Sequence, residues 1–411
     1  MIENKFASPA LRSLFEREFL YQFTDDAAMD RLFCGQEEVV FYVGYDPTAK
    51  SLHVGHLLWI RLVKKLQEAG LKPIILTGGA TAKIGDPTWK DAQRVMLDHS
   101  IIVENAAAID KKLAELISFG DSGNLASSLN NDDWLSHIKY MEFLRDFGPM
   151  FSVNKMLSMD SVSTRLERKQ HLSFLEFNYM LLQAYDFLHL FENHKCQLQV
   201  GGADQWANMV FGVDLIRKKT GKQAFGMSIP LLTNSVGQKM GKTETGAIWL
   251  DSAYTSPFDF WQYWRNVDDR DVTKFLKLFT DIPLDEIEQY EQMTGTSAIN
   301  EIKITLADAI TGFVHPSVDI DSIKRAAQCG HNLEGRPDVT GIETFYVQKF
   351  TKIDKALAIA DLAPSVTAGK RLIDGNAVKI NNRLVENYDV TIEADCFISV
   401  GRKKLVALKV F

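Results

Sequence analysis

The segment from Tyr42 to His56 constrains the fold of this chain more than any other. An apolar run, Val39–Val43, leads after a polar break into a helical pattern that begins at Ser51, with His53 and His56 in its first turns. A strand that feeds a helix is the repeating unit of an α/β sheet, and the N-terminus of such a helix binds phosphate through free N–H groups and its dipole. We expect Ser51 to be the N-cap. Residues three apart share a helix face, so both imidazoles can face one triphosphate.

A second cationic cluster lies far downstream, at Lys239-Met240-Gly241-Lys242-Thr243. Counted from Gly237, it is one residue short of the P-loop spacing, and no apolar helix follows. An exposed basic loop is the alternative for this segment alone. The His-x-x-His pair could likewise ligate zinc, but no acid or cysteine stands at ligand spacing, so we expect no metal site in the protein. Together, the two clusters indicate a nucleotide-binding enzyme.

Length and composition favour a multidomain globular protein. The chain has 411 residues, 46% of them apolar, which is enough for two or three domains. It contains no apolar run near the length of a membrane helix. Its four cysteines form no C-x-x-C pair, which indicates free thiols in a reducing compartment, and we expect a cytoplasmic protein.

Charge is unevenly distributed. The net charge is −7, yet from Lys349 onward the sequence holds 11 Lys and Arg residues against 7 Asp and Glu residues. A basic tail on an acidic body suits contact with a phosphate backbone, although a solvated surface is the alternative.

The first half of the sequence predicts a doubly wound parallel sheet, because short apolar runs alternate with helical patterns. The predicted strands are Val39–Val43, Ile74–Thr77, Gln197–Val200 and Ser228–Leu232, and the predicted helices are Leu52–Ala69, Ile101–Ser118, Leu175–Phe191 and Gln205–Lys219. We expect a Rossmann-like catalytic domain over residues 1–232, interrupted by an irregular segment at about 121–170.

The second half predicts a different organisation. After a loop that starts at 233, helices are expected from Ser256-Pro257, over about 270–279 and over 298–313, so that residues 233–329 form a loop and a helical domain. Residues 330–348 are expected to be a linker. Residues 349–411 predict a small α+β domain, with strands at 377–380, 390–392, 397–400 and 406–410 and a hairpin turn at Asn381-Asn382.

These motifs carry a resemblance. The His-Val-Gly-His and Lys-Met-Gly-Lys-Thr segments resemble the HIGH and KMSKS signatures of class I aminoacyl-tRNA synthetases. The surroundings, Gly201–Trp206 and Tyr179–Asp186, resemble the bacterial tyrosyl enzymes, and the likeness covers nearly the whole chain. It implies a ligase that activates L-tyrosine with ATP and transfers it to the 3′-terminal adenosine of tRNA(Tyr). It also implies Mg²⁺ carried by ATP, a homodimer formed through residues 121–170, and a tail of the ribosomal-protein RNA-binding type.

The resemblance assigns roles to particular residues. The catalytic set would be His53, His56, Lys239, Lys242 and Thr243, with Lys90 and Arg94 as cations of a further loop. The ATP-binding set would be Gly44, Asp46, Thr48, Gly55, Gly202, Asp204 and Lys242. The tyrosine-binding set would be Tyr42 and Asp186 at the phenol hydroxyl, Tyr179, Gln183, Gln199 and Asp86 at the ammonium group, and Gln205 beside them.

The residues themselves support part of this assignment. Tyr179, Gln183 and Asp186 follow one another at helical spacing and share one face, and a carboxylate on an otherwise apolar helix is costly to bury without a partner. Asp204 follows a predicted strand, at the sheet edge where α/β folds bind ligands. Alternatively, Asp186 is a structural acid and Asp204 merely caps the next helix.

Three other functions remain open. A tryptophanyl enzyme shares both nucleotide motifs, another nucleotidyltransferase would need no tail, and an RNA-binding paralogue would have no need of the histidines and lysines.

Overall fold

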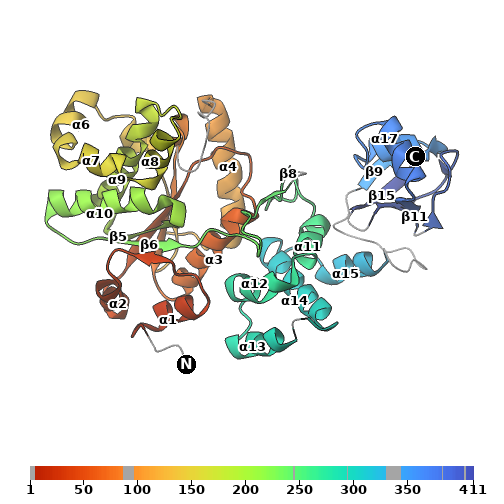
Figure 1. Cartoon of the computed structure of the whole chain (residues 1–411), viewed down its shortest axis with the longest axis horizontal. Coiled ribbons are helices and arrows are strands. Elements are labelled where there is room, and N and C mark those ends of the chain that lie inside the picture. Colours follow the sequence, from red (N-terminus) through yellow and green to blue (C-terminus); the bar gives the residue numbers. More distant parts are fainter. Residues whose placement is uncertain are drawn as a thin grey trace. The chain divides into compact units, whose positions relative to one another are not determined.

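The computed structural model describes residues 5–86, 97–243, 246–293, 295–329, 344–381, 383–401 and 404–411. The chain divides into two compact units, which we describe separately (Figure 1). The first comprises Met1–Ala247 and Lys277–Leu284, and the second comprises Ile248–Leu276 and Asp285–Phe411. Among the described residues, no helix combines the length and apolarity needed to cross a membrane.

The first unit is built on a six-stranded sheet in the order β1-β6-β5-β2-β3-β4. The strands are β1 (Gln22–Phe23), β2 (Val40–Tyr45), β3 (Lys72–Thr77), β4 (Ser127–Asn130), β5 (Cys196–Gly202) and β6 (Phe225–Ile229). All neighbouring pairs are parallel except β1 and β6, which confirms the predicted parallel sheet and adds one antiparallel edge strand. Strand β6 ends three residues before the predicted limit, because Pro230 follows and cannot donate to the ladder.

Helices connect and cover these strands. The longer ones are α1 (Pro9–Glu16), α2 (Asp26–Cys34), α3 (Val54–Glu68), α4 (His99–Leu116), α9 (Phe174–His194) and α10 (Trp206–Thr220). The prediction that Ser51 caps α3 is wrong. His53 is the N-cap, because its backbone is extended and its ring accepts the N–H of Gly55, whereas the Ser51 hydroxyl donates to the Leu52 carbonyl.

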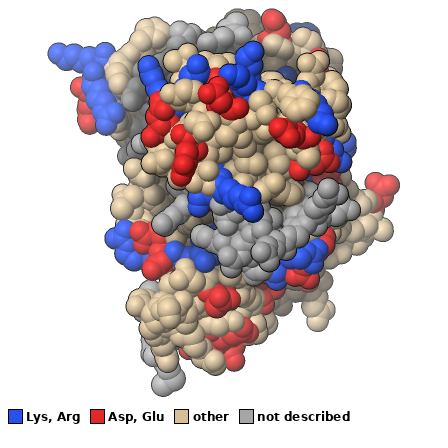
Figure 2. Space-filling view, turned by 90° about the vertical axis from the view of Figure 1, so that its right-hand side faces the viewer, with Lys and Arg blue, Asp and Glu red and all other residues tan. Residues whose placement is uncertain are grey.

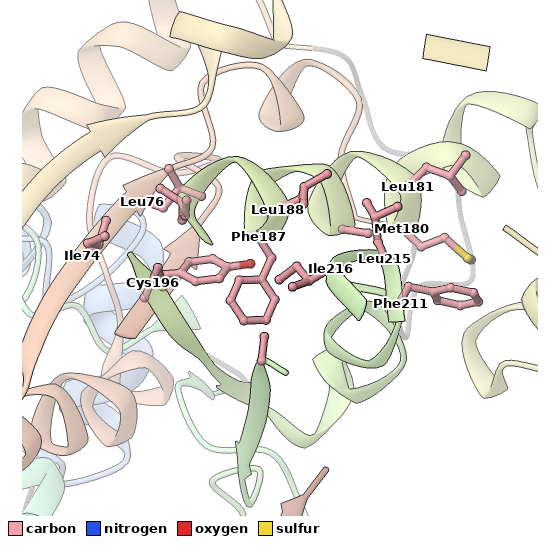
Figure 3. Packing of buried hydrophobic residues seen from close by; sticks show 14 of the residues in the cluster. Ile74, Leu76, Met180, Leu181, Phe187, Leu188, Cys196, Phe211, Leu215 and Ile216 are labelled. Carbon is pink, nitrogen blue, oxygen red and sulfur yellow. The ribbon is translucent and has the colours of Figure 1, made fainter. Parts of the chain in front are cut away.

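Helices α9 and α10 share a core with strands β2, β3 and β5. Figure 3 shows Phe187 of α9 beside Ile216 of α10, among the buried aliphatic side chains of this cluster. Phe187 is fully buried. This packing fixes the face of α9 that carries Tyr179, Gln183 and Asp186.

The irregular segment at 121–170 contains a strand that the sequence did not predict. Its polar sequence, Ser-Ser-Leu-Asn, has no strand signal, yet β4 pairs with β3 at the sheet edge. The short helices α5 (Asp132–Leu135), α6 (Tyr140–Asp146), α7 (Val153–Leu157) and α8 (Asp160–Glu167) follow. The apolar residues of this segment could serve either a dimer interface or the core of a single chain, and several of them pack against the core of the first unit: Trp134, Ile138, Phe143, Phe147, Met150 and Phe151.

Lys277–Leu284 belongs to the first unit because cations hold it there. Asp281 accepts from Arg61 at 2.7 Å and from Lys65 at 2.8 Å, and both of these residues lie on α3. The guanidinium of Arg17 donates to the carbonyls of Thr280 and Ile282. The division of the chain into two units therefore does not follow the boundaries expected at 232 and 329, since part of the expected helical domain contacts α3 and belongs to the first unit.

The second unit begins with helices. These are α11 (Pro257–Arg265), most of α12 (Val272–Phe279), α13 (Leu284–Gln292), α14 (Ile299–Val314) and α15 (Ile320–Cys329), of which α13 and α15 were not predicted. Ser256 caps α11, with Pro257 in its first turn as expected, and Trp261 and Trp264 are buried.

The chain ends in a small α+β fold with its own core. Helices α16 (Ile353–Ile359) and α17 (Val366–Asp374) accompany a sheet in the order β12-β11-β14-β15-β9. These strands are β9 (Thr344–Val347), β11 (Val378–Ile380), β12 (Arg383–Leu384), β14 (Cys396–Val400) and β15 (Lys404–Val410), and β10 (Thr351–Lys352) pairs separately with β13 (Thr391–Ile392). The expected linker over 330–348 extends too far, because β9 pairs with β15, while residues 330–343 lie outside the described part.

Candidate active site

A cavity of about 550 Å³ opens where β2 and β5 end, between the N-terminus of α3 and the polar face of α9. Every predicted site residue whose side chain or glycine backbone is described lines it. These are Tyr42, Gly44, Asp46, Thr48, His53, Gly55, His56, Asp86, Tyr179, Gln183, Asp186, Gln199, Gly202, Asp204, Gln205 and Lys239. Lys90 and Arg94 lie outside the described residues, and so do the side chains of Lys242 and Thr243.

The two histidines form a reciprocal cap at the start of α3. The Gly55 N–H donates to His53 Nδ1 at 3.0 Å, and the His53 N–H donates to His56 Nδ1 at 3.1 Å. Because both Nδ1 atoms accept from the backbone, each ring carries its proton on Nε2. Burial lowers the pKa of His56 to about 3, with His53 as a further cause, so His56 is a neutral donor at neutral pH.

The distant cationic cluster meets this cap. A Cβ on Gly55 would lie 3.1 Å from the Met240 carbonyl oxygen, and one on Gly241 would lie 2.6 Å from His53 Nδ1. Gly241 also has a φ of +104°, which glycine adopts without strain. Glycine at position 55 leaves room for the loop backbone and the His53 ring, which a side chain there would meet.

Lys239 lies near Asp204, which follows the end of strand β5. Its charge lowers the pKa of Asp204, against the stronger effect of burial, which raises that pKa. A Cβ on Gly202 would lie 2.5 Å from Asp204 Oδ1, so this glycine lets the carboxylate fold back over the end of β5. Cation and carboxylate therefore stand at one edge of the cavity.

A carboxylate surrounded by donors lies at the bottom of the cavity. Asp186 is 2% exposed and accepts from Trp134 Nε1 at 2.7 Å and from Asn131 Nδ2 at 3.0 Å. Burial raises the pKa of Asp186 to about 7, although both donors oppose the shift. The Tyr42 hydroxyl is buried without a hydrogen-bond partner within the described structure, and burial together with Asp186 raises its pKa. A buried hydroxyl beside a buried carboxylate fits a ligand that offers one hydroxyl to both.

Further acceptors form a second polar end. Tyr179 donates to Asp46 Oδ2 at 2.9 Å, and Gln205 donates to Asp86 Oδ2 at 2.6 Å. Gln199 Oε1 is buried and has no protein partner among the described groups. Carboxylate and amide oxygens gathered in this way suit a ligand ammonium group.

Four polar residues of the site were missed from the sequence. Asn131 and Trp134 hold Asp186, Thr81 donates to Asp46 at 2.7 Å, and Asn208 donates to both Gln183 and Gln205. Asn208 follows Gln205 at helical spacing and could have been found from the face that the two share. The others have no local signal, because Asn131 and Trp134 come from the segment around β4.

Comparison with known proteins agrees with this geometry. A family model described as class I tRNA synthetases (W and Y) matches residues 35–329. The tyrosine–tRNA ligase of Wolbachia sp. subsp. Drosophila simulans is 45% identical over 99% of this chain and 100% of its own length. That of Rickettsia conorii is 44% identical over 97% of this chain and 99% of its own.

A solved structure supports the same relationship. A C-terminally truncated mitochondrial tyrosyl-tRNA synthetase of Aspergillus nidulans has a TM-score of 0.69 and 31% identity, covering 79% of this chain and 95% of its own. The tyrosyl-tRNA synthetase of Archaeoglobus fulgidus, complexed with L-tyrosine, shares the fold at a TM-score of 0.57 and 20% identity. The chain therefore belongs to the tyrosyl-tRNA synthetases of class I.

Proposed function

We propose that the chain activates L-tyrosine with ATP and transfers the tyrosyl group to the 3′-terminal adenosine of tRNA(Tyr), using the cavity at the carboxyl edge of the sheet. The observation that carries this proposal is the presence in one cavity of a buried hydroxyl–carboxylate pair, Tyr42 with Asp186, and a cationic loop folded on a histidine cap. The first suits a phenol and the second a triphosphate.

In the first step, the tyrosine carboxylate attacks the α-phosphorus of ATP, the bond to the β-phosphate oxygen breaks, and pyrophosphate leaves. Such a reaction needs placement and neutralisation of spreading charge rather than a nucleophilic side chain. Neutral His53 and His56 would donate from Nε2 to phosphate oxygens. Lys239, Lys242 and Thr243 would bind the departing pyrophosphate, with Lys90 and Arg94 adding charge and Mg²⁺ entering with ATP. Gly44, Thr48, Gly202 and Asp204 would border the adenosine.

Tyrosine would lie between the two polar ends of the cavity. Its phenol hydroxyl would donate to Asp186 and accept from Tyr42. Its ammonium group would meet Asp86, Tyr179, Gln183, Gln199 and Gln205. Rejection of phenylalanine by polar groups left unpaired is an established property of tyrosyl enzymes.

The test of this function is pyrophosphate exchange with ATP, measured for each of the twenty amino acids. Tyrosine alone should support rapid exchange. Exchange driven by tryptophan would favour the tryptophanyl alternative. No exchange with any of the twenty amino acids would contradict the proposed function and leave another nucleotidyltransferase or an RNA-binding paralogue.

We infer that the helical part and residues 349–411 bind tRNA. On the face shown in Figure 2, positive and negative side chains are interspersed. The inference rests on the basic excess of residues 349–411. In a chain that ends at residue 341, the rate of aminoacylation should therefore fall by about tenfold or more, because several phosphate contacts with tRNA are lost. Tyrosine-dependent pyrophosphate exchange should stay near normal. Equal loss of both activities would show that the tail is structural.

We infer that the chain forms a cytoplasmic homodimer through the segment expected at about 121–170 together with the start of α9, where residues 140–175 carry the exposed apolar groups. Seven large apolar residues are exposed in this segment, including Met141 at 73% and Phe174 at 68%. The others are Tyr140, Val153, Leu157, Leu166 and Leu175. Exposed apolar groups at this density are typical of a protein interface. Sedimentation should give twice the chain mass of 46.4 kDa, and Met141→Glu should shift the population toward monomer, whereas a monomeric unmodified chain would contradict the proposal.

A further inference from the structure

We propose that His189 is a positioning residue for the phenol hydroxyl of the substrate, because its imidazole holds the Trp134 indole in the orientation in which the indole binds Asp186. The inference rests on the proposed function and adds a residue that touches neither tyrosine nor ATP. His189 lies three residues after Asp186 on α9 and stacks on the face of the Trp134 indole.

The first observation is the geometry of the stack. The rings of Trp134 and His189 have centroids 4.2 Å apart and an interplanar angle of 15°, so they lie face to face. Trp134 Nε1 donates in the plane of the same indole to Asp186 Oδ1 at 2.7 Å. A stacked neighbour restricts rotation of the indole out of that plane, and the N–H therefore stays directed at the carboxylate.

The second observation is that the element carrying the indole does not bury it. Helix α5 has four residues, none of them buried, and Trp134 is only partly buried, at the place where it packs against the core cluster of the first unit. The ion pair between Lys83 and Asp132 at 2.7 Å anchors the backbone of this helix, but it does not restrict the rotation of the Trp134 ring. Stacking on His189 adds to the core contacts a constraint on the orientation of the ring.

The third observation concerns the state of the imidazole. Asn193 Nδ2 lies 3.4 Å from His189 Nδ1, and Asn193 also donates to the His189 carbonyl at 2.9 Å. The Asn193 amide therefore faces His189 Nδ1 and can donate to it in the tautomer that carries its proton on Nε2. Burial lowers the pKa of His189, with His194 as a further cause. A neutral ring stacks on the indole without placing positive charge beside Asp186.

The consequence for recognition follows from the burial of Asp186. If the indole turns, the carboxylate loses one of its two side-chain donors in the described structure and its pKa rises further, because those donors oppose the effect of burial. A protonated Asp186 accepts the phenol hydroxyl poorly. Loss of the stack therefore weakens tyrosine binding and narrows the preference for tyrosine over phenylalanine, while the ATP end is untouched.

The test compares His189→Ala with His189→Phe in pyrophosphate exchange by the full-length enzyme. The alanine variant should raise KM for tyrosine about three- to tenfold, the effect of one aromatic pair, and reduce the tyrosine-to-phenylalanine preference by a similar factor. KM for ATP should not change. The phenylalanine variant keeps a flat ring and should restore both values to within about twofold.

A control and a double-mutant cycle separate positioning from a structural role. His194→Ala, on the same helix with ring centroids 6.2 Å apart from His189, should leave KM for tyrosine unchanged. Trp134→Phe removes the N–H but keeps a ring, and adding His189→Ala to it should cause no further loss, because the two act through one bond. Unchanged KM for tyrosine in His189→Ala, an equal rise in KM for ATP, or additive losses would overturn the proposal. Absence of tyrosine-dependent exchange in the unmodified enzyme would instead refute the proposed function.

Discussion

Replacing Lys242 by alanine is expected to slow tyrosyl-adenylate formation by about 10²- to 10³-fold, the usual loss when one group that stabilises transition-state charge is removed. Lys242 directly follows Gly241, which packs on the His53 ring, and it begins the strand β7 (Lys242–Thr243), which pairs with β8 (Gly246–Ala247). Its backbone is thus held beside the histidine cap. A charge supplied there acts on the departing pyrophosphate, and tyrosine binding should change little because tyrosine lies at the other end of the cavity.

Single-turnover measurement of adenylate formation checks this expectation, together with equilibrium binding of tyrosine. Lys222→Ala is the matched control, since Lys222 is an exposed lysine in the loop after α10 and does not line the cavity. An unchanged single-turnover rate in Lys242→Ala would remove the lysine from the mechanism. A parallel loss of tyrosine affinity would mean that the loop shapes the whole cavity rather than the transition state.

The candidate site residues that the sequence brought together in one cavity are those that form a local pattern. The histidine cap, the cationic loop and the spaced polar face of α9 each lie within one element, so their spacing alone places them together. Asp186 illustrates both the success and the limit of this approach. Its position on an apolar helix indicated a buried carboxylate, but its partners Asn131 and Trp134 come from a segment without a strand or helix signal.

The elements that the sequence predicted wrongly or missed also depend on contacts that no local sequence pattern reveals. Strand β4 has a polar sequence, and pairing with β3 at the sheet edge decides its structure. The N-cap of α3 is His53 rather than the predicted Ser51, because the imidazole caps the helix. The sequence did not indicate this, since histidine is not among the usual capping residues. Lys277–Leu284 belongs to the first unit through contacts with Arg17, which follows α1, and with Arg61 and Lys65 of α3, and these residues lie more than 200 positions away in the sequence. Contacts at such separation leave no periodic pattern.

Replacing Asp186 by asparagine is expected to lower kcat/KM for tyrosine by about 10- to 100-fold, which corresponds to one hydrogen bond to a charged group. The amide has nearly the same shape as the carboxylate, but it lacks the charge that favours the phenol hydroxyl. Phenylalanine has no hydroxyl to lose, so its slow activation should change much less and the preference for tyrosine should shrink. Pyrophosphate exchange with both amino acids measures this. Gln183→Glu serves as a comparison at the ammonium end, because it should alter KM without reducing the preference.

The raised pKa of Asp186 adds a pH dependence whose sign can be worked out. Its pKa is about 7 in the folded, ligand-free chain and near 4 when unfolded, so between these values the folded state binds more protons. The resulting stability is fully present below about pH 4 and is lost as the pH rises through about 7. Urea unfolding from pH 5 to 8 should therefore show the free energy of unfolding of the unmodified chain falling relative to that of Asp186→Asn, with the difference levelling off above pH 7.

Tyrosine requires the ionised carboxylate, so KM for tyrosine should fall over the same range in the unmodified enzyme and stay flat in the variant. Parallel pH profiles for the two proteins would mean that Asp186 is already ionised throughout and that its two donors outweigh its burial.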